Sequence, residues 1–155
     1  MDEAVPLERY VHPVLGFALD LPPGMEIHDT GPDVALIARE AEGAAPSSFR
    51  ANLTVVVERL HAGTTLDQYV DGSLREQTRT LGLWLLIDEE ETTLAGRPAS
   101  RTLGHHVFGE YGIALEQWRL VDGERGWVVG ASCDVLDYPV VADVATACAE
   151  SLELP

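Results

Sequence analysis

The spacing of apolar residues along the chain changes repeatedly, and each change predicts a change of secondary structure. In the first part of the chain, apolar residues alternate with polar ones or form short runs, as in β-strands, over 14–21, 34–39 and 50–60. Over 66–81 they recur every three or four positions, which is the spacing of an amphipathic α-helix. Strand-like patterns return over 83–133, and helical spacing returns over 141–152. The predicted order is therefore strands, helix, strands, helix.

Turn-forming and capping residues set the ends of these elements. The Pro-Pro-Gly sequence at 22–24 ends the first strand. Thr64 is placed to cap the first helix, Asp67 adds negative charge to its first turn, and Gly82 follows its last turn. Asp137 is the candidate N-cap of the second helix.

The strands are predicted to pair with their neighbours in sequence. Strands 34–39 and 50–60 are joined by a loop at 40–48 that is rich in alanine, glycine, proline and serine, and they are expected to pair antiparallel. Turns that contain glycine separate four strands that should form an antiparallel meander: 83–91, 98–108, 112–121 and 126–133. This order does not fit alternating βα units, so we expect an α+β fold in a single domain over 1–155.

Composition restricts what the protein can bind and where it acts. With 10 basic and 26 acidic residues among 155, the net charge is −16, which opposes binding to nucleic acid or to anionic membrane surfaces. No stretch approaches the roughly 18 to 20 consecutive apolar residues of a membrane-spanning helix, so we expect no membrane insertion. The acidic start of the chain lacks the regions of a signal peptide, and we therefore expect a cytoplasmic protein.

The residues that could hold a metal or a disulfide are poorly placed for these roles. Cys133 and Cys148 are too few for a zinc site, and we interpret them as buried thiols; in an exported protein they could instead form a disulfide. His105 and His106 are adjacent on a predicted strand, so their side chains should point to opposite faces. The acidic run 88–91 lacks the pattern of a calcium loop and is interpreted as a solvated strand end.

The sequence contains none of the common catalytic motifs. It has no nucleophile elbow, no phosphate-binding glycine loop, no His-Glu-Xaa-Xaa-His and no Cys-Xaa-Xaa-Cys. We therefore expect a protein without enzymatic activity, metal or cofactor.

The tryptophans differ in their predicted surroundings. Trp127 shares a strand face with apolar residues and is expected in the core. Trp118 shares its face with Glu116, and the alternate face of the same strand is also polar. Because a sheet face that no helix covers has this pattern, we hypothesise that Trp118, Glu116 and, on the neighbouring strand, Arg101 form an exposed partner-binding face. The competing interpretation places Trp118 in the core or in a dimer interface.

Three segments around the central helix resemble the Mog/PsbP-like superfamily: GFALDLPPGM (Gly16–Met25), LAGRPASR (Leu94–Arg101) and LEQWRLVDGERGWVVGASC (Leu115–Cys133). This superfamily includes PsbP, a Ran-binding import factor, LpqN lipoproteins, DcrB-type proteins and Eag-type chaperones. The resemblance implies a curved antiparallel sheet of about six strands, flanked by two main helices that lie on one side of it. It also implies protein binding rather than catalysis, and no site residue carries over from it.

Three functions remain open at this point. The first is a non-enzymatic protein-binding module, adaptor or chaperone-like, that presents a sheet face or edge to an unidentified protein partner. Exposed apolar strands are also compatible with a homodimer. The alternatives are a carrier or sensor that encloses a small hydrophobic ligand between sheet and helix, and an undetected enzyme or calcium-binding domain that uses residues 88–91.

Overall fold

The computed structural model describes residues 6–28, 34–42 and 49–155. Within them the chain forms the elements β1 (Glu8–Val11), β2 (Ala18–Leu21), β3 (Glu26–His28), β4 (Val34–Arg39), β5 (Asn52–Arg59), α1 (Leu66–Thr80), β6 (Gly82–Leu94), β7 (Arg97–Phe108), β8 (Tyr111–Asp122), β9 (Arg125–Asp134) and α2 (Tyr138–Glu150). The antiparallel pairing of β4 with β5 and the meander from β6 to β9 are confirmed. Residues 43–48 of the predicted loop lie outside the described residues.

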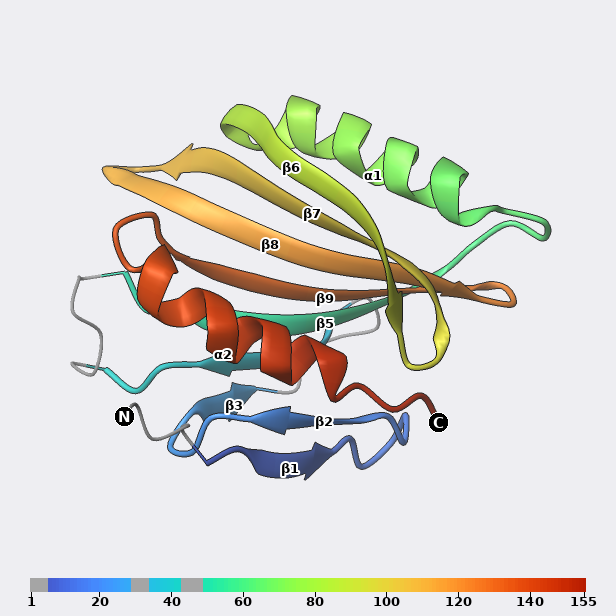
Figure 1. The fold of residues 1–155 in the computed structure, drawn as a ribbon, viewed down its shortest axis with the longest axis horizontal. Helices are drawn as coiled ribbons and strands as arrows, with labels where there is room; N and C mark the ends of the chain where they lie inside the picture. Colours follow the sequence, from blue (N-terminus) through green and yellow to red (C-terminus); the bar gives the residue numbers. More distant parts are fainter. Residues whose placement is uncertain (1–5, 29–33, 43–48) are drawn as a thin grey trace.

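One antiparallel sheet of seven strands organises the fold, in the order β3-β4-β5-β9-β8-β7-β6. The α+β class is confirmed, but the sheet has seven strands rather than about six. Of the segment predicted as the first strand, only β2 is extended, and it pairs with β1 in a separate two-stranded sheet. Figure 1 shows β6 at one edge of the large sheet and β3 at the other.

The two helices cover opposite faces of the large sheet. On β8, the Gln117 side chain accepts a hydrogen bond from Gln77 of α1, whereas the preceding residue, Glu116, accepts one from Tyr138 of α2. Because successive residues of a strand point to opposite faces, α1 and α2 lie on different sides of the sheet. The expectation that both helices shelter one side is therefore wrong. α2 lies on the face of Glu116, which was expected to be bare, and α1 covers β6, β7 and β8 on the other face (Figure 1).

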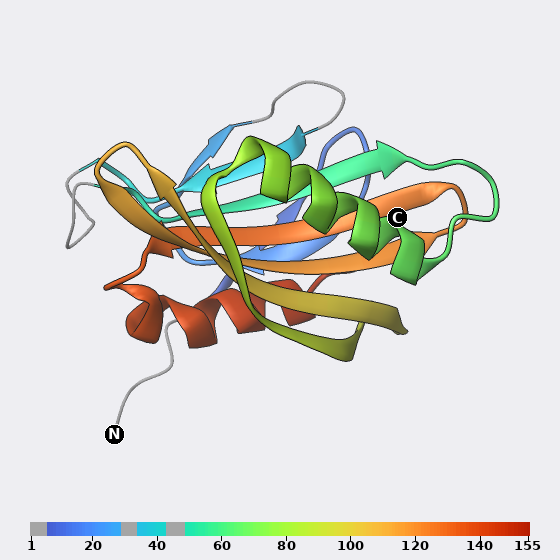
Figure 2. The same cartoon turned by 90° about the horizontal axis from the view of Figure 1, so that it is seen from above.

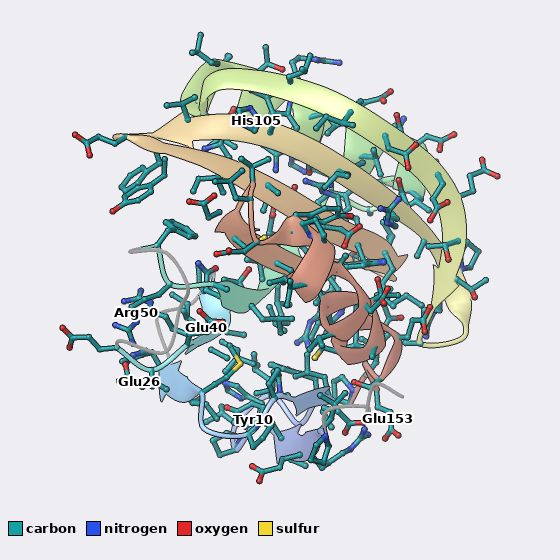
Figure 3. All side chains as sticks on the ribbon, turned by 60° about the vertical axis from the view of Figure 1, so that its left-hand side comes forward. Tyr10, Glu26, Glu40, Arg50, His105 and Glu153 are labelled. Atoms are coloured by element: carbon teal, nitrogen blue, oxygen red, sulfur yellow. The ribbon has the colours of Figure 1, made fainter. Side chains whose placement is uncertain are left out.

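Most of the apolar core lies on the α2 face, between the sheet, α2 and the β1–β2 hairpin. Trp127 is 1% exposed, as predicted, and its ring packs edge-on against Phe17 beside the hairpin, with centroids 5.6 Å apart. The chain end returns to this hairpin, where Glu153 bridges to Ala18. In Figure 3, Tyr10 of β1 and Glu153 are both labelled at the base of the molecule, at separate positions.

A polar cluster lies at the corner of the sheet formed by β3, β4 and the start of β5. Arg50 donates from Nε to the backbone carbonyl of Glu40 and from Nη2 to the Glu26 carboxylate, each at 2.6 Å. Figure 3 shows these three labelled side chains gathered at that corner. These polar contacts at the surface therefore link β3, the end of β4 and the start of β5.

The first helix is capped one residue later than the sequence predicted. The Thr65 hydroxyl accepts a hydrogen bond from the Gln68 backbone N–H at 3.1 Å, and the Gln68 side chain accepts one from the Thr65 N–H at 3.0 Å. Together these bonds form a capping box. Thr64 instead donates to the His61 carbonyl in the preceding turn. The second helix begins after Asp137, as predicted. No helix within the described ranges is long and apolar enough to span a membrane.

The large sheet is strongly twisted (Figure 2). Near its β6 edge, a glycine of β7 lies against the ring of a tryptophan of β6. A Cβ added at Gly104 in β7 would come within 1.9 Å of the Trp84 ring in β6. Gly104 is therefore required by packing at this position, because any side chain would displace the indole.

We expect Gly104→Ala to lower the free energy of unfolding by about 1–3 kcal/mol, since the Trp84 ring must move to admit the added methyl group. Gly72→Ala in α1 is the matched control. An added Cβ there meets no described atom within 4 Å, so the better helix propensity of alanine should raise stability by about 1 kcal/mol. Urea unfolding measures both changes. Similar effects from the two substitutions would contradict the packing of Trp84 on Gly104.

Candidate functional site

The three residues proposed from the sequence lie together on the α2 face, where they belong to an ion-pair cluster. Arg101 in β7 donates from Nε to the Glu116 carboxylate in β8 at 2.7 Å, and its Nη2 contacts the same carboxylate. Trp118 is the cross-strand neighbour of Arg101. Tyr138, at the start of α2, donates to Glu116 at 3.1 Å.

This cluster is buried rather than exposed. Trp118 and Glu116 are each 2% exposed. The expectation of an uncovered face at these residues is therefore wrong, because α2 covers the polar positions and supplies Tyr138 as a donor. A partner-binding role for Trp118, Glu116 and Arg101 stays a prediction, and it would require α2 to move away from the sheet.

Arg101 connects the buried carboxylate to the acidic edge of the sheet. Its Nη1 lies 3.0 Å from Asp88 and 3.5 Å from Glu90, both in β6. Burial lowers the pKa of Arg101, but hydrogen bonds to Glu116 and Asp88 outweigh burial, so the pKa is raised above its ordinary value. Burial, followed by the charge of Glu116, raises the pKa of Tyr138. The guanidinium therefore stays charged, and the phenol keeps the proton that it donates.

We expect Arg101→Leu to lower the free energy of unfolding by about 3–5 kcal/mol, because it leaves the Glu116 carboxylate buried without a cationic partner. The double variant Arg101→Leu/Glu116→Leu should recover much of that loss. Arg97→Leu, which breaks an exposed pair with Asp122, is the control and should cost less than about 1 kcal/mol. Urea unfolding of the four proteins gives the comparison. A double variant no more stable than Arg101→Leu would contradict this role of the pair.

The described cysteines and histidines do not gather into a metal or redox site. Cys133 and Cys148 are free and buried, as interpreted from the sequence. Burial raises the pKa of Cys133 to about 12 and that of Cys148 to about 11, so both remain protonated thiols. Burial and the neighbouring His105 lower the pKa of His106. Among the described residues, no group of three or more histidines, cysteines or carboxylates could hold a metal ion.

An apolar groove lies between α2 and the β4–β5–β9 part of the sheet. Its volume is about 330 Å³, and most of its lining side chains are apolar. Val144 and Cys148 come from α2, and Leu53 comes from β5. The polar residues Glu40 and Asn52 also line the groove. Its size and lining are those of a small-molecule site.

The edge strand β6 exposes large apolar side chains along its first half. Leu83 is 81%, Leu85 is 61% and Ile87 is 57% exposed. The sequence analysis missed this surface. Its signal was the nearly continuous apolar run at 83–87, which is also what a buried strand shows. Only the position of β6 at the sheet edge, set by pairing between distant segments, exposes the run.

The second half of β6 is a regular and acidic sheet edge. Two register irregularities interrupt the pairing of 82–88 with β7, whereas 88–94 pairs residue by residue. Among the described strands β6 pairs only with β7, so its outer backbone groups face away from the sheet. The side chains of 88–91 are exposed, as predicted, but the run lies within β6 rather than at a strand end or turn.

A second groove, of about 760 Å³, lies between α1 and this regular part of β6. Asp67 and Asp71 of α1 and Glu89 and Glu91 of β6 line it. No described arginine or histidine forms an ion pair with any of these four carboxylates. The described ion pairs of β6 use Asp88 and Glu90 instead. The groove is therefore a concentrated negative surface, which we call the acidic groove.

Known proteins resemble this chain in fold rather than in sequence. No protein-family model matches it, and no curated protein matches it significantly. Cyanobacterial PsbP (CyanoP) from Synechocystis sp. PCC 6803 is similar over 99% of this chain and 95% of its own, with a TM-score of 0.70 and 15% identity. LpqN of Mycobacterium tuberculosis, involved in cell envelope biogenesis, is similar over 97% and 91%, with a TM-score of 0.70 and 12% identity. The Ran-binding protein Mog1p of Saccharomyces cerevisiae is similar over 98% and 86%, with a TM-score of 0.62 and 12% identity.

These similarities place the chain in a class of α+β proteins whose antiparallel sheet carries helices. The fold is that of the Mog/PsbP-like superfamily, as the resemblance of the three sequence segments predicted. At identities of 12% to 15% the similarity extends to the fold alone. None of the three proteins is named for an enzymatic activity.

Proposed function

We propose that this protein is a non-enzymatic protein-binding module, of adaptor or chaperone-like type, that presents the edge strand β6 to a partner. The observation that carries the proposal is the exposure of Leu83, Leu85 and Ile87 on a strand whose outer side is unpaired. Edge strands of this kind are normally protected, because they pair readily with a strand of another chain. A partner strand added there would extend the sheet and cover these side chains.

Three further observations support this function. Phe108 is 66% exposed and follows Val107, which pairs with Gly82 at the start of β6, so the apolar surface continues past the strand. Among proteins of this fold, Mog1p is a Ran-binding protein, and by analogy the fold is suited to protein recognition. A net charge of −16 would also keep a complex with an apolar client soluble.

A photo-reactive amino acid placed at Leu85 tests this function in the native host. We expect a cross-link to one defined protein, whereas the same amino acid at Val14, which is 82% exposed between β1 and β2, should give none. Leu85→Arg should then weaken binding of that purified protein by at least about tenfold, because a charge would enter an apolar contact. Identical adducts at both positions, or an unchanged affinity of Leu85→Arg, would refute the proposal.

A second candidate function is the carriage or sensing of a small hydrophobic ligand. The groove beside α2 favours it, because its volume of about 330 Å³ lies in the range of small-molecule sites and its lining is mainly apolar. Glu40 and Asn52 in the lining could orient a polar group at one end of the ligand.

Fluorescence titration with a dansyl-labelled fatty acid measures this second activity. We expect the wild-type protein to bind the probe and Val144→Phe to weaken binding by about tenfold or more, because the larger ring fills the groove. Val14→Phe, which adds a phenyl ring at an exposed site outside the groove, is the control and should leave binding unchanged. No binding to the wild-type protein, or equal binding to both variants, would exclude the groove as the ligand site.

A further inference from the structure

We infer that β6 and the acidic groove bind an extended, basic segment of the partner protein, with lysine or arginine at every second position. This inference rests on the proposed protein-binding function and specifies the chemistry of the segment bound. Its basis is the arrangement of charge on the two sides of one sheet edge, together with the open edge itself.

The two faces of the β6 edge differ in how their charge is balanced. Asp88 and Glu90 point to the α2 face, where Arg101 lies within ion-pair distance of both. Glu89 and Glu91 point to the α1 face, where they meet Asp67 and Asp71 across the acidic groove. A bound strand therefore meets uncompensated negative charge on one face only. Because alternate side chains of a strand share a face, a partner strand that neutralises this charge needs basic side chains at alternate positions.

The spacing of the carboxylates fits an extended segment. Glu89 and Glu91 are two residues apart on a strand, which separates them by about 7 Å along its direction. Asp67 and Asp71 are four residues apart on a helix, which separates them by about 6 Å along its axis. Basic residues two apart on an added strand repeat at about the same 7 Å. The carboxylates on each element are therefore spaced nearly as far apart as the basic residues of an added strand.

The hydroxyl of a largely buried serine in the groove provides an observation independent of charge. Ser100 lies beside Glu91 in the β6–β7 ladder, is only 7% exposed and lines the acidic groove. Most of the residue is buried, but its hydroxyl makes no hydrogen bond to another described residue and is not among the fully buried atoms left without a partner, so it is reached from the groove. It is therefore available to a ligand that enters between α1 and β6.

A second copy of this chain is the competing occupant of the edge, and charge disfavours it. Pairing β6 with β6 would bring two acidic edges together, and each copy carries a net charge of −16. Like charges placed opposite each other on neighbouring strands are destabilising. A basic strand instead gains from each such position, and its binding should weaken as salt screens the charges.

Two fluorescein-labelled peptides of about ten residues test the inference by fluorescence anisotropy with the full chain. One alternates arginine and threonine; the other has the same composition with all arginines at one end. We expect the alternating peptide to bind at least about tenfold more tightly and its affinity to fall with added salt. Equal affinities for the two peptides would overturn the inference, because they would indicate unspecific attraction to a negative protein.

Charge-neutral variants locate the binding. Glu89→Gln/Glu91→Gln and, separately, Asp67→Asn/Asp71→Asn should each weaken binding of the alternating peptide by about tenfold. Glu124→Gln/Glu150→Gln removes the same charge from two exposed residues outside the groove and should have little effect. An equal loss in the control variant would overturn the inference. So would a stable dimer, seen by analytical ultracentrifugation, that the peptide does not dissociate.

The outcomes separate this inference from the proposed function. If the photo-reactive residue at Leu85 captures a partner but the order of charges in the peptides does not matter, protein binding at β6 stands and the basic segment is wrong. If neither a cross-link at Leu85 nor selective peptide binding is found, both are wrong.

Discussion

Burial of β8 on both of its faces is the constraint on which the rest of the structure depends. α1 covers Gln117 and Arg119, and α2 covers Glu116 and Trp118. Because Glu116 and Arg119 are almost fully buried on opposite faces of the strand, their charged groups need partners inside the protein. This requirement determines what the neighbouring strand and both helices contribute: Arg101 on β7, and one polar side chain from each helix.

The two buried charges of β8 are stabilised in different ways. Glu116 has a direct cationic partner in Arg101. Arg119 is 1% exposed and donates to neutral oxygens, those of Thr102 at 3.0 Å and Gln117 at 2.7 Å. Burial lowers the pKa of Arg119, and negative charge at a longer range, including that of Glu89, acts in the opposite direction. Glu89 of the acidic groove is thus one of the charges that act on the buried Arg119.

The sequence predicts those parts of the fold that depend on local pattern. Alternation and turn residues indicated the meander, and the capping pattern placed the start of the first helix to within one residue. The side on which each helix packs could not be predicted. A strand that is polar on both faces indicates either an uncovered face or a face covered by polar contacts. The two contacts that show which face each helix covers join residues far apart in sequence. Gln77 is 40 residues from its partner Gln117, and Tyr138 is 22 residues from its partner Glu116.

The acidic groove could not be predicted from the sequence for a related reason. In sequence, 88–91 is one acidic run, but strand alternation divides it into two pairs with different surroundings. One pair, Asp88 and Glu90, is exposed and contacts Arg101 at the edge of the buried cluster, whereas Glu89 and Glu91 line the groove under α1. Because the sheet separates the two pairs, a partner that neutralises the groove side leaves the Arg101 cluster in place. A basic segment bound in the groove would therefore act on Glu89 and on its interaction with the buried Arg119, and not on the Arg101 cluster.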